Sequence, residues 1–445
     1  MRLSLLEVLE ATGGGNLGGT QVGDSFTTFH TDSREVVRGG IFFALKGAEM
    51  DGHQFVGDAV SRGAGAIVAE RRSEIPTGIA EIAVKDAWAA LYAVAAYALD
   101  RVRPLVVAVT GSNGKTSTKE MVAAILATQY NVLRTQGNLN TETGVPMTIL
   151  GLEPHHTALV LEMGMQRAGD IGRLAALAKP SIGIVTNIGT VHMEFFASRA
   201  ALARAKGELV AALPENGLAV LNADDEFFPL LARMTTARIA SFGREQGDYR
   251  VEGYFVPSVG RSRFSVRGAD VSLTLGGRHQ ALNAAAALAA GEGAGVALAA
   301  GAAALAGVVV GHRLEELETR SGFSVVDDAY NASPESMLAA FEALTEQPRH
   351  GRLLAVLAEM GELGEESTEA HRSVGERAAE AFDAVCVIDS VRGRILAESA
   401  HAHLVPDRRA AVRWVKRNAR KGDRVLVKGS HAARLDEVVK GLAET

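Results

Sequence analysis

Gly114, Lys115 and Thr116 follow one another in the stretch LVVAVTGSNGKTSTKEM. The apolar residues before them predict a buried strand, and the residues after them predict a helix. A lysine ammonium and the free N–H groups at a helix start can bind a phosphate chain, and a threonine hydroxyl can bind Mg²⁺. The glycine that opens the full phosphate-loop pattern would stand at Val109, so the loop is shortened. We predict a nucleotide phosphate site formed by Gly111, Ser112, Asn113, Gly114, Lys115, Thr116 and Ser117.

The alternative to this phosphate site is a tight turn that carries an exposed lysine. The strand, the Gly-Lys-Thr sequence and the helix coincide, which favours nucleotide binding. The sequence contains no Asn-Lys-x-Asp motif for guanine recognition, so ATP is favoured over GTP.

Polar residues also follow two other apolar runs. TALVLEMG leads to Glu162, and SIGIVTNIG leads to Asn187 and then His192. Open α/β sheets bind ligands beyond the carboxyl ends of their strands, and a carboxylate beside a phosphate is an expected Mg²⁺ ligand. Alone, each would be interpreted as a solvated rim or loop residue; together with the loop they indicate a metal and phosphate site.

Lys206 lies in the helix-like stretch SRAALARAKGELVAAL. Its spacing from Leu202, Leu209 and Leu213 places it inside the apolar stripe of that helix. The simpler interpretation is that its stem reaches the surface or that its amine pairs with a carboxylate. The sharper one is that burial lowers the pKa of the amine, which then adds CO₂ and becomes an anionic carbamate able to bind a metal ion.

The elements that must position these residues predict an α/β protein of three domains. Residues 1–103 contain the strand-like runs GGIFFALKG and GAGAIVAE, the helical stretch HQFVGDAVSRG and a closing helix AWAALYAVAAYALD. Residues 104–313 begin at Pro104 and contain the runs described above, which predict a mostly parallel, doubly wound sheet. Residues 314–445 contain four more such runs, FSVVDDAYN, RLLAVLAEMG, DAVCVIDS and DRVLVKGS.

Composition limits the classes of function. The chain has 445 residues, 47% of them hydrophobic and 22% charged, and a formal net charge of −6, so we expect no nucleic-acid partner. Its single cysteine, Cys386, excludes an internal disulfide. The first residues lack the order of a secretory signal, and we interpret the uncharged run at 293–311 as packed helices, not a membrane span. We therefore expect a cytoplasmic protein without membrane insertion that acts on a small substrate.

The ordered motifs of the chain, from about Thr31 to the C-terminus, resemble those of the Mur ligases: TGSNGKTSTKEM, GNLNTETGVPMT, LEMGM, TNIGTVHMEFF, AKGE, GGRHQALNAAAA, GHRLE, DDAYNASPESM, LAEMGELG and LVKGS. Within the family they are most similar to the members that add a dipeptide. The resemblance implies an ATP-dependent amide ligase of peptidoglycan synthesis, with substrates UDP-N-acetylmuramoyl-tripeptide and D-alanyl-D-alanine. It also implies an N-terminal domain for the UDP-sugar, a central ATPase domain and a Rossmann-like C-terminal domain, and we expect a monomer.

The resemblance also implies roles for individual residues. Lys115 would contact the β- and γ-phosphates of ATP, Thr116 and Glu162 would bind one Mg²⁺, and His192 and carbamylated Lys206 would bind a second. The resemblance further assigns adenine to Asn283, ATP phosphates and ribose to Arg313 and Asp328, the UDP-sugar to Ser33, Asn138 and Asn140, and the incoming dipeptide to Asn331.

Two positions depart from the family pattern. In the family, an asparagine usually follows the histidine of GGRHQALN; this chain has Gln280 there. The usual Tyr-Asn-Ala-Asn is Tyr-Asn-Ala-Ser in this chain, with Ser333 as the last residue. Gln280 can keep amide hydrogen bonding, and we predict that Ser333 caps a helix that begins at Pro334.

The chemistry that the resemblance implies starts from a carboxylate that resists an amine. Transfer of the γ-phosphoryl group of ATP makes an acyl phosphate, and phosphate then leaves when the amine attacks. Three alternatives stay open: a sibling ligase that adds an amino acid, a folylpolyglutamate synthase, and a nucleotide-gated binding protein without ligase turnover. The sequence shows no Asp-Asn-Pro-Arg segment of the diaminopimelate-adding type, and it leaves open whether the third residue of the tripeptide is lysine, diaminopimelate or ornithine.

Overall fold

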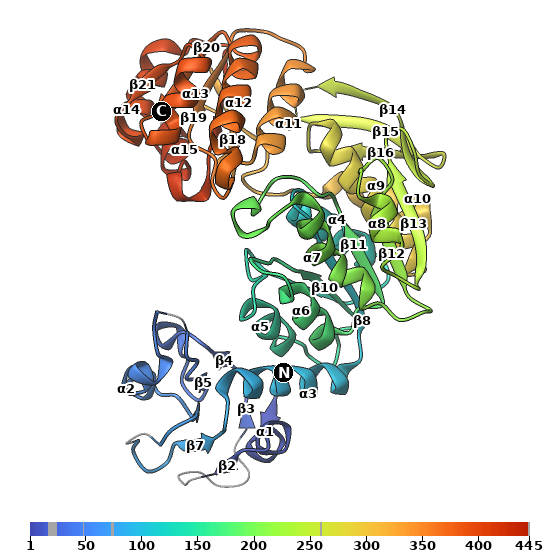
Figure 1. Cartoon of the computed structure of the whole chain (residues 1–445), viewed down its shortest axis with the longest axis vertical. Coiled ribbons are helices and arrows are strands. Elements are labelled where there is room, and N and C mark those ends of the chain that lie inside the picture. The colour runs from blue at the N-terminus through green and yellow to red at the C-terminus, as the bar shows by residue number, and fades with distance from the viewer. Residues whose placement is uncertain (17–24, 48, 73–74, 259, 444–445) are drawn as a thin grey trace. The chain divides into compact units, whose positions relative to one another are not determined.

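The computed structural model describes residues 1–16, 25–47, 49–72, 75–258 and 260–443. Contacts divide the chain into two units, and each is described by itself (Figure 1). The first comprises Met1–Ala108, Tyr130–Met165 and Asp170–Ser181; the second comprises Val109–Gln129, Gln166–Gly169 and Ile182–Thr445. The predicted domain boundaries after residues 103 and 313 stay predictions.

The first unit opens with β1 (Leu3–Ser4), which pairs with β3 (Ser25–Phe26) and leads into α1 (Leu5–Thr12). A five-stranded sheet follows in the order β2-β7-β6-β5-β4, parallel except at β2. Its strands are β2 (Gly15–Asn16), β4 (Phe29–His30), β5 (Ile41–Phe43), β6 (Ala66–Ala69) and β7 (Ala80–Ala83). The strands expected in GGIFFALKG and GAGAIVAE are thus confirmed.

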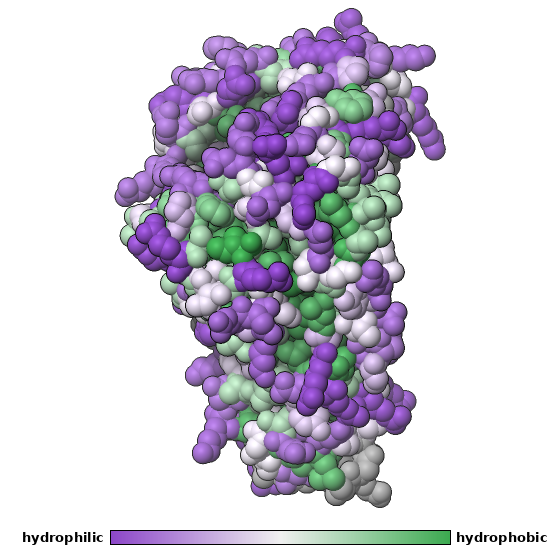
Figure 2. All heavy atoms as spheres, turned by 90° about the vertical axis from the view of Figure 1, so that its right-hand side faces the viewer, coloured by the Kyte–Doolittle hydropathy of each residue, from purple (hydrophilic) through white to green (hydrophobic). Residues whose placement is uncertain are grey.

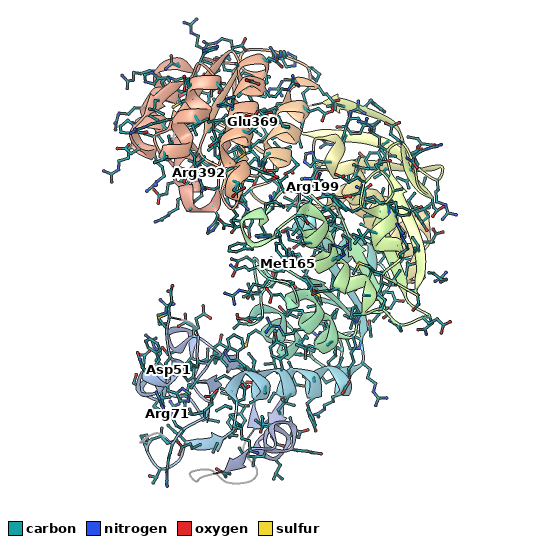
Figure 3. All side chains as sticks on the ribbon, viewed as in Figure 1. Asp51, Arg71, Met165, Arg199, Glu369 and Arg392 are labelled. Atoms are coloured by element: carbon teal, nitrogen blue, oxygen red, sulfur yellow. The ribbon has the colours of Figure 1, made fainter. Side chains whose placement is uncertain are left out.

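Helices of the first unit also follow the predicted pattern. The expected helix in HQFVGDAVSRG is the 3₁₀ turn η2 (Gly52–Phe55) followed by α2 (Val56–Ser61). Arg71, two residues after the end of β6, pairs with Asp51, which caps η2 (Figure 3). The closing helix is α3 (Ala87–Val102), capped by Asp86 and packed against α1, α5 (Gly144–Leu150) and α6 (Asp170–Ala178).

The first unit also contains the parallel strands β9 (Val132–Arg134) and β10 (Ala158–Glu162). All five residues of β10 are buried, as expected for a strand covered on both faces. The strand ends on Glu162, at the position predicted from its apolar run.

In the second unit, α4 (Lys115–Leu126) follows β8 (Leu105–Thr110), whose last two residues belong to this unit. Next come β11 (Ile182–Val185), α7 (Arg199–Ala211), β12 (Leu218–Asn222), α8 (Phe228–Ala232) and β13 (Arg238–Gly243), with β11, β12 and β13 parallel. Strands β14 (Tyr249–Ser258), β15 (Arg261–Val266) and β16 (Ala269–Leu273) then form an antiparallel extension that the sequence analysis did not predict.

Helix α9 (Arg278–Gly293) contains eleven buried residues and packs against α4, β12, β13 and β14. Its alanines allow this close approach, because each side chain is a single methyl group. The following uncharged run forms α10 (Leu298–Ala304) and the turn η4 (Leu305–Gly307), which pack on α4 and β16. The expectation of packed helices there is confirmed. In the described part of the chain, no helix is both long and apolar enough to cross a bilayer.

The C-terminal part of the second unit is a six-stranded sheet in the order β17-β18-β22-β19-β20-β21, parallel except at β17. Its strands are β17 (Glu315–Glu318), β18 (Ser324–Asp328), β19 (Leu353–Leu357), β20 (Ala384–Ile388), β21 (His403–Val405) and β22 (Arg424–Lys428). All four strands predicted in this region are therefore present.

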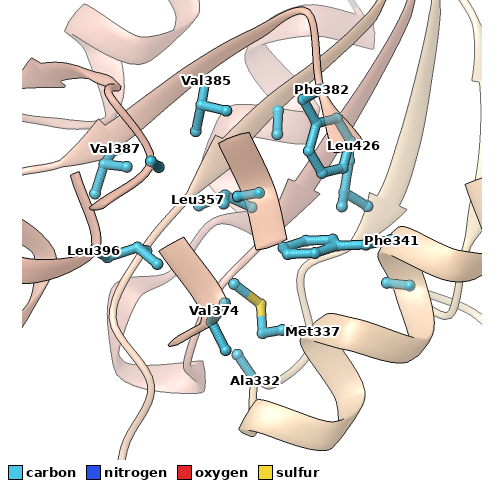
Figure 4. Close-up of a cluster of buried hydrophobic side chains, with 14 of the residues drawn as sticks. Ala332, Met337, Phe341, Leu357, Val374, Phe382, Val385, Val387, Leu396 and Leu426 are labelled. Atoms are coloured by element: carbon cyan, nitrogen blue, oxygen red, sulfur yellow. The ribbon is translucent and has the colours of Figure 1, made fainter. Parts of the chain in front are cut away.

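Helices cover both faces of this sheet. One core lies under α11 (Pro334–Thr345), α12 (Ser367–Ala381) and α13 (Val391–Ser399), where the rings of Phe341 and Phe382 meet edge to face at 5.0 Å (Figure 4). A second core lies under α14 (Arg408–Asn418) and α15 (Asp436–Ala443). The exposed side chains of one face of the molecule are mainly hydrophilic, with hydrophobic ones between them (Figure 2), as is usual for folded proteins.

Candidate functional site

The turn between β8 and α4 requires glycine at two positions. Gly111 has φ +143°, and a Cβ there would lie 1.9 Å from Thr186 Oγ1. Gly114 has φ +82°, and a Cβ there would lie 2.4 Å from Asn283 Oδ1. At both positions the backbone has a positive φ and a side chain would clash with a neighbour. Glycine is therefore required for the loop to approach Thr186 and Asn283 this closely.

Hydrogen bonds hold the loop against the end of β11. The Ser112 N–H donates to Asn187 O at 2.9 Å, and the Asn113 N–H donates to Asn187 Oδ1 at 3.0 Å. Asn187 Nδ2 returns a bond to Asn113 O at 3.1 Å, and the Gly189 N–H donates to Ser112 Oγ at 2.9 Å. The prediction that Asn187 stands just beyond its strand is confirmed, and its amide fixes the shape of the loop.

Lys115 is the first residue of α4, as the sequence predicted. Its ammonium folds over the loop and donates to Gly111 O at 2.9 Å and to Ser112 O at 3.1 Å. A positive charge is thus held at the positive end of the α4 dipole, where an anion is stabilised.

Lys206 lies on α7, one residue in a helix capped by Ser198, and is 1% exposed. Its amine donates to Gly111 O at 3.1 Å. Burial, and next the charge of Lys115, lower the pKa of Lys206 well below its usual value. The inward orientation is confirmed, whereas the simpler interpretation is wrong: the stem does not reach the surface, and among the described residues the amine bonds to a backbone carbonyl and pairs with no carboxylate. A neutral amine at this position has the chemistry needed to add CO₂.

His192 lies on the loop that follows β11 and runs from Ile188 to Phe195. Its backbone is left-handed, with φ +71°. The imidazole Nδ1 lies 2.5 Å from Glu362 Oε2, so the contact joins the loop to the segment between β19 and α12.

These elements surround a cavity of about 310 Å³ in the second unit. Seven of the predicted site residues line it: Asn113, Gly114, Thr116, Ser117, Asn283, Arg313 and Asp328. The structure therefore brings together the phosphate loop, the residue predicted at adenine and two residues predicted at the phosphates and ribose. Gly111, Ser112, Lys115 and Lys206 belong to the loop and its support without lining the cavity, and Asn331 lies outside it.

Amide and arginine side chains shape the cavity wall. Asn283 is buried on α9 and its Nδ2 donates to Gln280 Oε1 at 3.1 Å, so Gln280 does keep amide hydrogen bonding. The guanidinium of Arg313 lies over the ring of Tyr330 at 4.5 Å, which fixes its direction.

Three titratable residues that line the cavity were not predicted from the sequence: His279, Lys428 and Glu335. Lys428, at the end of β22, is fully buried and pairs with Asp328 Oδ2 at 2.6 Å while donating to Asn331 O at 3.0 Å. Burial above all lowers the pKa of His279 to about 4, so the imidazole is neutral. The sequence did contain a signal for these three residues, because each lies inside one of the motifs that resemble those of the Mur ligases.

Ser333 performs the predicted cap. Its Oγ accepts the Ser336 N–H at 3.2 Å at the start of α11, with Pro334 at the first helical position. The same hydroxyl donates to Asn113 Oδ1 at 3.1 Å. One side chain thus links α11 to the phosphate loop.

The remaining predicted residues lie in the first unit. Glu162 is 3% exposed, so it is not a solvated rim residue; its Oε1 accepts from Asn140 Nδ2 at 2.8 Å. Its Oε2 is buried and has no hydrogen-bond partner in the described part of the chain, as a ligand atom for a cation would be. Ser33 is buried in the 3₁₀ turn η1 (Ser33–Glu35), and Asn138 is exposed in the loop after β9.

The donors suit hard cations. Glu162 and Thr116 offer oxygen ligands of the kind that Mg²⁺ prefers, and a carbamate on Lys206 would offer two more. Within the described residues, no cluster of three or more His, Cys, Asp or Glu side chains is already assembled around a metal position. A metal ion beside Thr116 or Lys206 would thus depend on hydroxyl, carbamate and phosphate oxygens.

Family models match most of the chain. The Mur ligase family catalytic domain matches residues 26–130, the Mur ligase middle domain matches 109–291, and the Mur ligase glutamate ligase domain matches 312–431.

Individual relatives agree with these matches. The UDP-N-acetylmuramoyl-tripeptide–D-alanyl-D-alanine ligase of Bacillus subtilis is 36% identical, with 93% of each chain covered. A crystal structure of MurF from Acinetobacter baumannii superposes with a TM-score of 0.90 at 28% identity, covering 100% of this chain and 99% of that one. MurF ligase from Thermotoga maritima, in complex with ADP, gives 0.84 at 32% identity over 94% and 97%. The predicted fold class is thus confirmed, and the chain belongs to the Mur ligase family.

Proposed function

We propose that this chain is an ATP-dependent ligase that joins D-alanyl-D-alanine to the peptide carboxylate of UDP-N-acetylmuramoyl-tripeptide. ADP and phosphate are released, and the product is a peptidoglycan precursor made in the cytoplasm. The observation that carries the proposal is the cavity between the phosphate loop, Asn283 and the residues Arg313 and Asp328. The names of the relatives and the ADP bound to the Thermotoga maritima ligase support the same activity.

The loop residues bind and orient the nucleotide. Backbone N–H groups at the start of α4 face the phosphates, and the Lys115 ammonium moves from the loop carbonyls to the β- and γ-phosphates. Once the nucleotide is bound, Lys115 and the α4 dipole are in place to stabilise the negative charge that develops during phosphoryl transfer. The chain therefore moves the γ-phosphoryl group onto the tripeptide carboxylate, and the resulting acyl phosphate reacts with the amine of the dipeptide.

Two Mg²⁺ ions complete the site in this proposal. Thr116 and Glu162 hold one, and His192 and carbamylated Lys206 hold the other. When bound, the ions neutralise phosphate charge and act as Lewis acids. The lowered pKa of Lys206 and the buried Oε2 of Glu162 support these assignments.

Contacts to the two other substrates are proposed from the family pattern. Ser33, Asn138 and Asn140 contact the UDP-sugar, and Asn331 contacts the incoming dipeptide. Asn331 is exposed; its backbone carbonyl accepts from the buried Lys428 at 3.0 Å, and its side-chain Oδ1 accepts from the His431 N–H at 3.4 Å. We further propose that the chain acts as a monomer.

Two measurements test the proposal. ADP release is followed with a panel of UDP-peptides, ending in lysine, diaminopimelate or ornithine, and a panel of amines. Release that requires D-alanyl-D-alanine supports the dipeptide-adding ligase; release with a free amino acid or glutamate supports a sibling ligase or a folylpolyglutamate synthase. Nucleotide binding without amine-dependent release supports a nucleotide-gated binding protein.

The order of steps is tested without the dipeptide. Enzyme, Mg²⁺, ATP and the UDP-tripeptide should form an acyl phosphate that borohydride traps as the corresponding alcohol. Release of AMP and pyrophosphate would refute the scheme, because the carboxylate would then have been adenylated.

A further inference from the structure

The loop 188–195, which carries His192, is held at its first residues by side chains of the second unit. The Ile188 N–H donates to Asp225 Oδ2 at 2.7 Å, and Ile188 O accepts from Arg199 Nη2 at 2.9 Å (Arg199 is labelled in Figure 3). With the bond from Gly189 to the phosphate loop, this start of the loop is fixed to the centre of the site.

Glu335 on α11 holds the next residue. Its Oε1 accepts both the N–H and the hydroxyl of Thr190, at 2.8 and 2.9 Å. Gly189 leaves room for this carboxylate, because a Cβ there would lie 2.9 Å from Glu335 Oε1. The backbone that leads to His192 is therefore set by a residue from the segment after β18.

A second carboxylate of the C-terminal segment reaches the imidazole itself. Glu362 Oε2 lies 2.5 Å from His192 Nδ1. Because Nδ1 is in contact with the carboxylate, Nε2 is the ring nitrogen left for another ligand. Metal-bound histidines commonly have this arrangement, in which a carboxylate fixes the tautomer and direction of the ring.

Backbone geometry at both partners is unusual. His192 has φ +71° and Glu362 has φ +61°, a region that side-chain-bearing residues enter at a cost. Next to them, a Cβ on Gly364 would lie 3.1 Å from Glu194 Cα, so the two loops are in close backbone contact. The two strained residues meet because the loops that carry them pack together.

We propose that Glu362 is a positioning residue that orients His192 for metal binding. Glu335 and Glu362, which follow β18 in the chain, then contribute to the metal site without binding the metal themselves. Glu335 holds the backbone at Thr190, and Glu362 orients the imidazole of His192. This inference rests on the proposed role of His192 as a metal ligand.

The positioning role of Glu362 is tested by measuring Mn²⁺ binding to the full chain in the presence of ADP and bicarbonate. The electron paramagnetic resonance signal of free Mn²⁺ reports how much metal is unbound. Loss of an orienting carboxylate should weaken metal binding in Glu362→Ala about 10–100-fold. Glu362→Gln keeps a hydrogen-bond acceptor and should recover part of that loss. Glu365→Ala removes an exposed carboxylate three residues away and is the matched control, expected to bind Mn²⁺ as the unmodified chain does. In the ligase assay, Glu362→Ala should raise the Mg²⁺ concentration for half-maximal rate and leave kcat at saturating Mg²⁺ nearly unchanged.

His192→Ala separates the inference from the assignment on which it rests. If His192→Ala weakens Mn²⁺ binding and Glu362→Ala does not, the positioning role of Glu362 is wrong while the metal ligand stands. If His192→Ala binds Mn²⁺ normally, both the ligand assignment and the inference are overturned. Equal losses in Glu362→Ala and Glu365→Ala would also overturn the inference, because they would reflect net charge alone.

Discussion

Gly114→Ala places a methyl group at the point where the phosphate loop meets α9. The residue has φ +82°, and the new Cβ would lie 2.4 Å from Asn283 Oδ1. Asn283 is buried and donates to Gln280 Oε1, so it cannot move away without losing that hydrogen bond. We expect the substitution to lower both stability and nucleotide affinity.

The magnitude has two parts. A side chain in the left-handed region costs about 1–2 kcal/mol. Loss of the bond between Asn283 and Gln280 costs about 1 kcal/mol more. Gly114→Ala should therefore lower the free energy of unfolding by about 2–3 kcal/mol. Because Asn283 is the residue proposed at adenine, ADP affinity should fall about tenfold, the equivalent of one hydrogen bond.

Gly268→Ala is the matched control. Gly268 has nearly the same backbone angle, φ +79°, but nothing lies within 4 Å of a Cβ built there. It should show the backbone cost of about 1–2 kcal/mol alone, with ADP affinity unchanged. Urea unfolding and calorimetric titration with ADP measure both quantities.

The double variant Gly114→Ala/Asn283→Ala tests the cause. Both single substitutions remove the same hydrogen bond, so the double variant should be less destabilised than their sum, by about 1 kcal/mol. Strict additivity, or equal losses in Gly114→Ala and Gly268→Ala, would refute the conclusion that contact with Asn283 is what requires glycine in the loop.

Four further outcomes follow from named groups. Lys115→Ala should abolish ligation with the fold intact by circular dichroism, since its proposed partner is the nucleotide; near-normal turnover would contradict the assignment. Activity should fall when CO₂ is stripped from the buffer and return with bicarbonate, and density for an unmodified Lys206 amine paired with a carboxylate, with metal present, would count against the carbamate. Burial lowers the pKa of His279 from 6.5 to about 4, so the unfolded chain binds a proton that the folded chain does not between those values, and stability should fall as pH drops through that window. The free energy of unfolding should fall by about 3 kcal/mol across that pH window. His279→Leu should lack this part of the pH dependence, which urea unfolding at a series of pH values measures. Cys386 is buried and its pKa is raised to about 12, so iodoacetamide should modify it only after unfolding; rapid labelling of the native chain at pH 8 would be the contrary result.

Local sequence determined the parts of the site that lie on one element. The apolar run that begins at Leu105 predicted a buried strand, and Gly114 followed by Lys115 predicted the start of the helix after it; both are present. Likewise, the spacing of Lys206 within its helix placed the amine inward, and Ser333 before Pro334 predicted a cap. Helical periodicity and capping act over a few residues, so these features are visible without the fold.

Strands with one exposed face were the main omission in the fold. β15 alternates exposed and buried residues, and with β14 and β16 it forms the antiparallel extension. The strands predicted from the sequence were all continuous apolar runs. Such runs mark strands buried on both faces, which is why β8, β10 and β11 were found and these were not. The parallel strands β12 and β13 were also not predicted.

Pairings between distant segments were decided only by tertiary structure. Thr190 and Glu335 are 145 positions apart, and nothing near either residue in the sequence specifies the other. The same holds for His192 with Glu362 and for the ion pair of Asp328 with Lys428, which joins the ends of two neighbouring parallel strands. Residue types and periodicity fix which side chains leave an element and in which direction. Which partners they meet depends on strand order and helix packing, because the free energy of those contacts is gained only when the whole sheet is assembled.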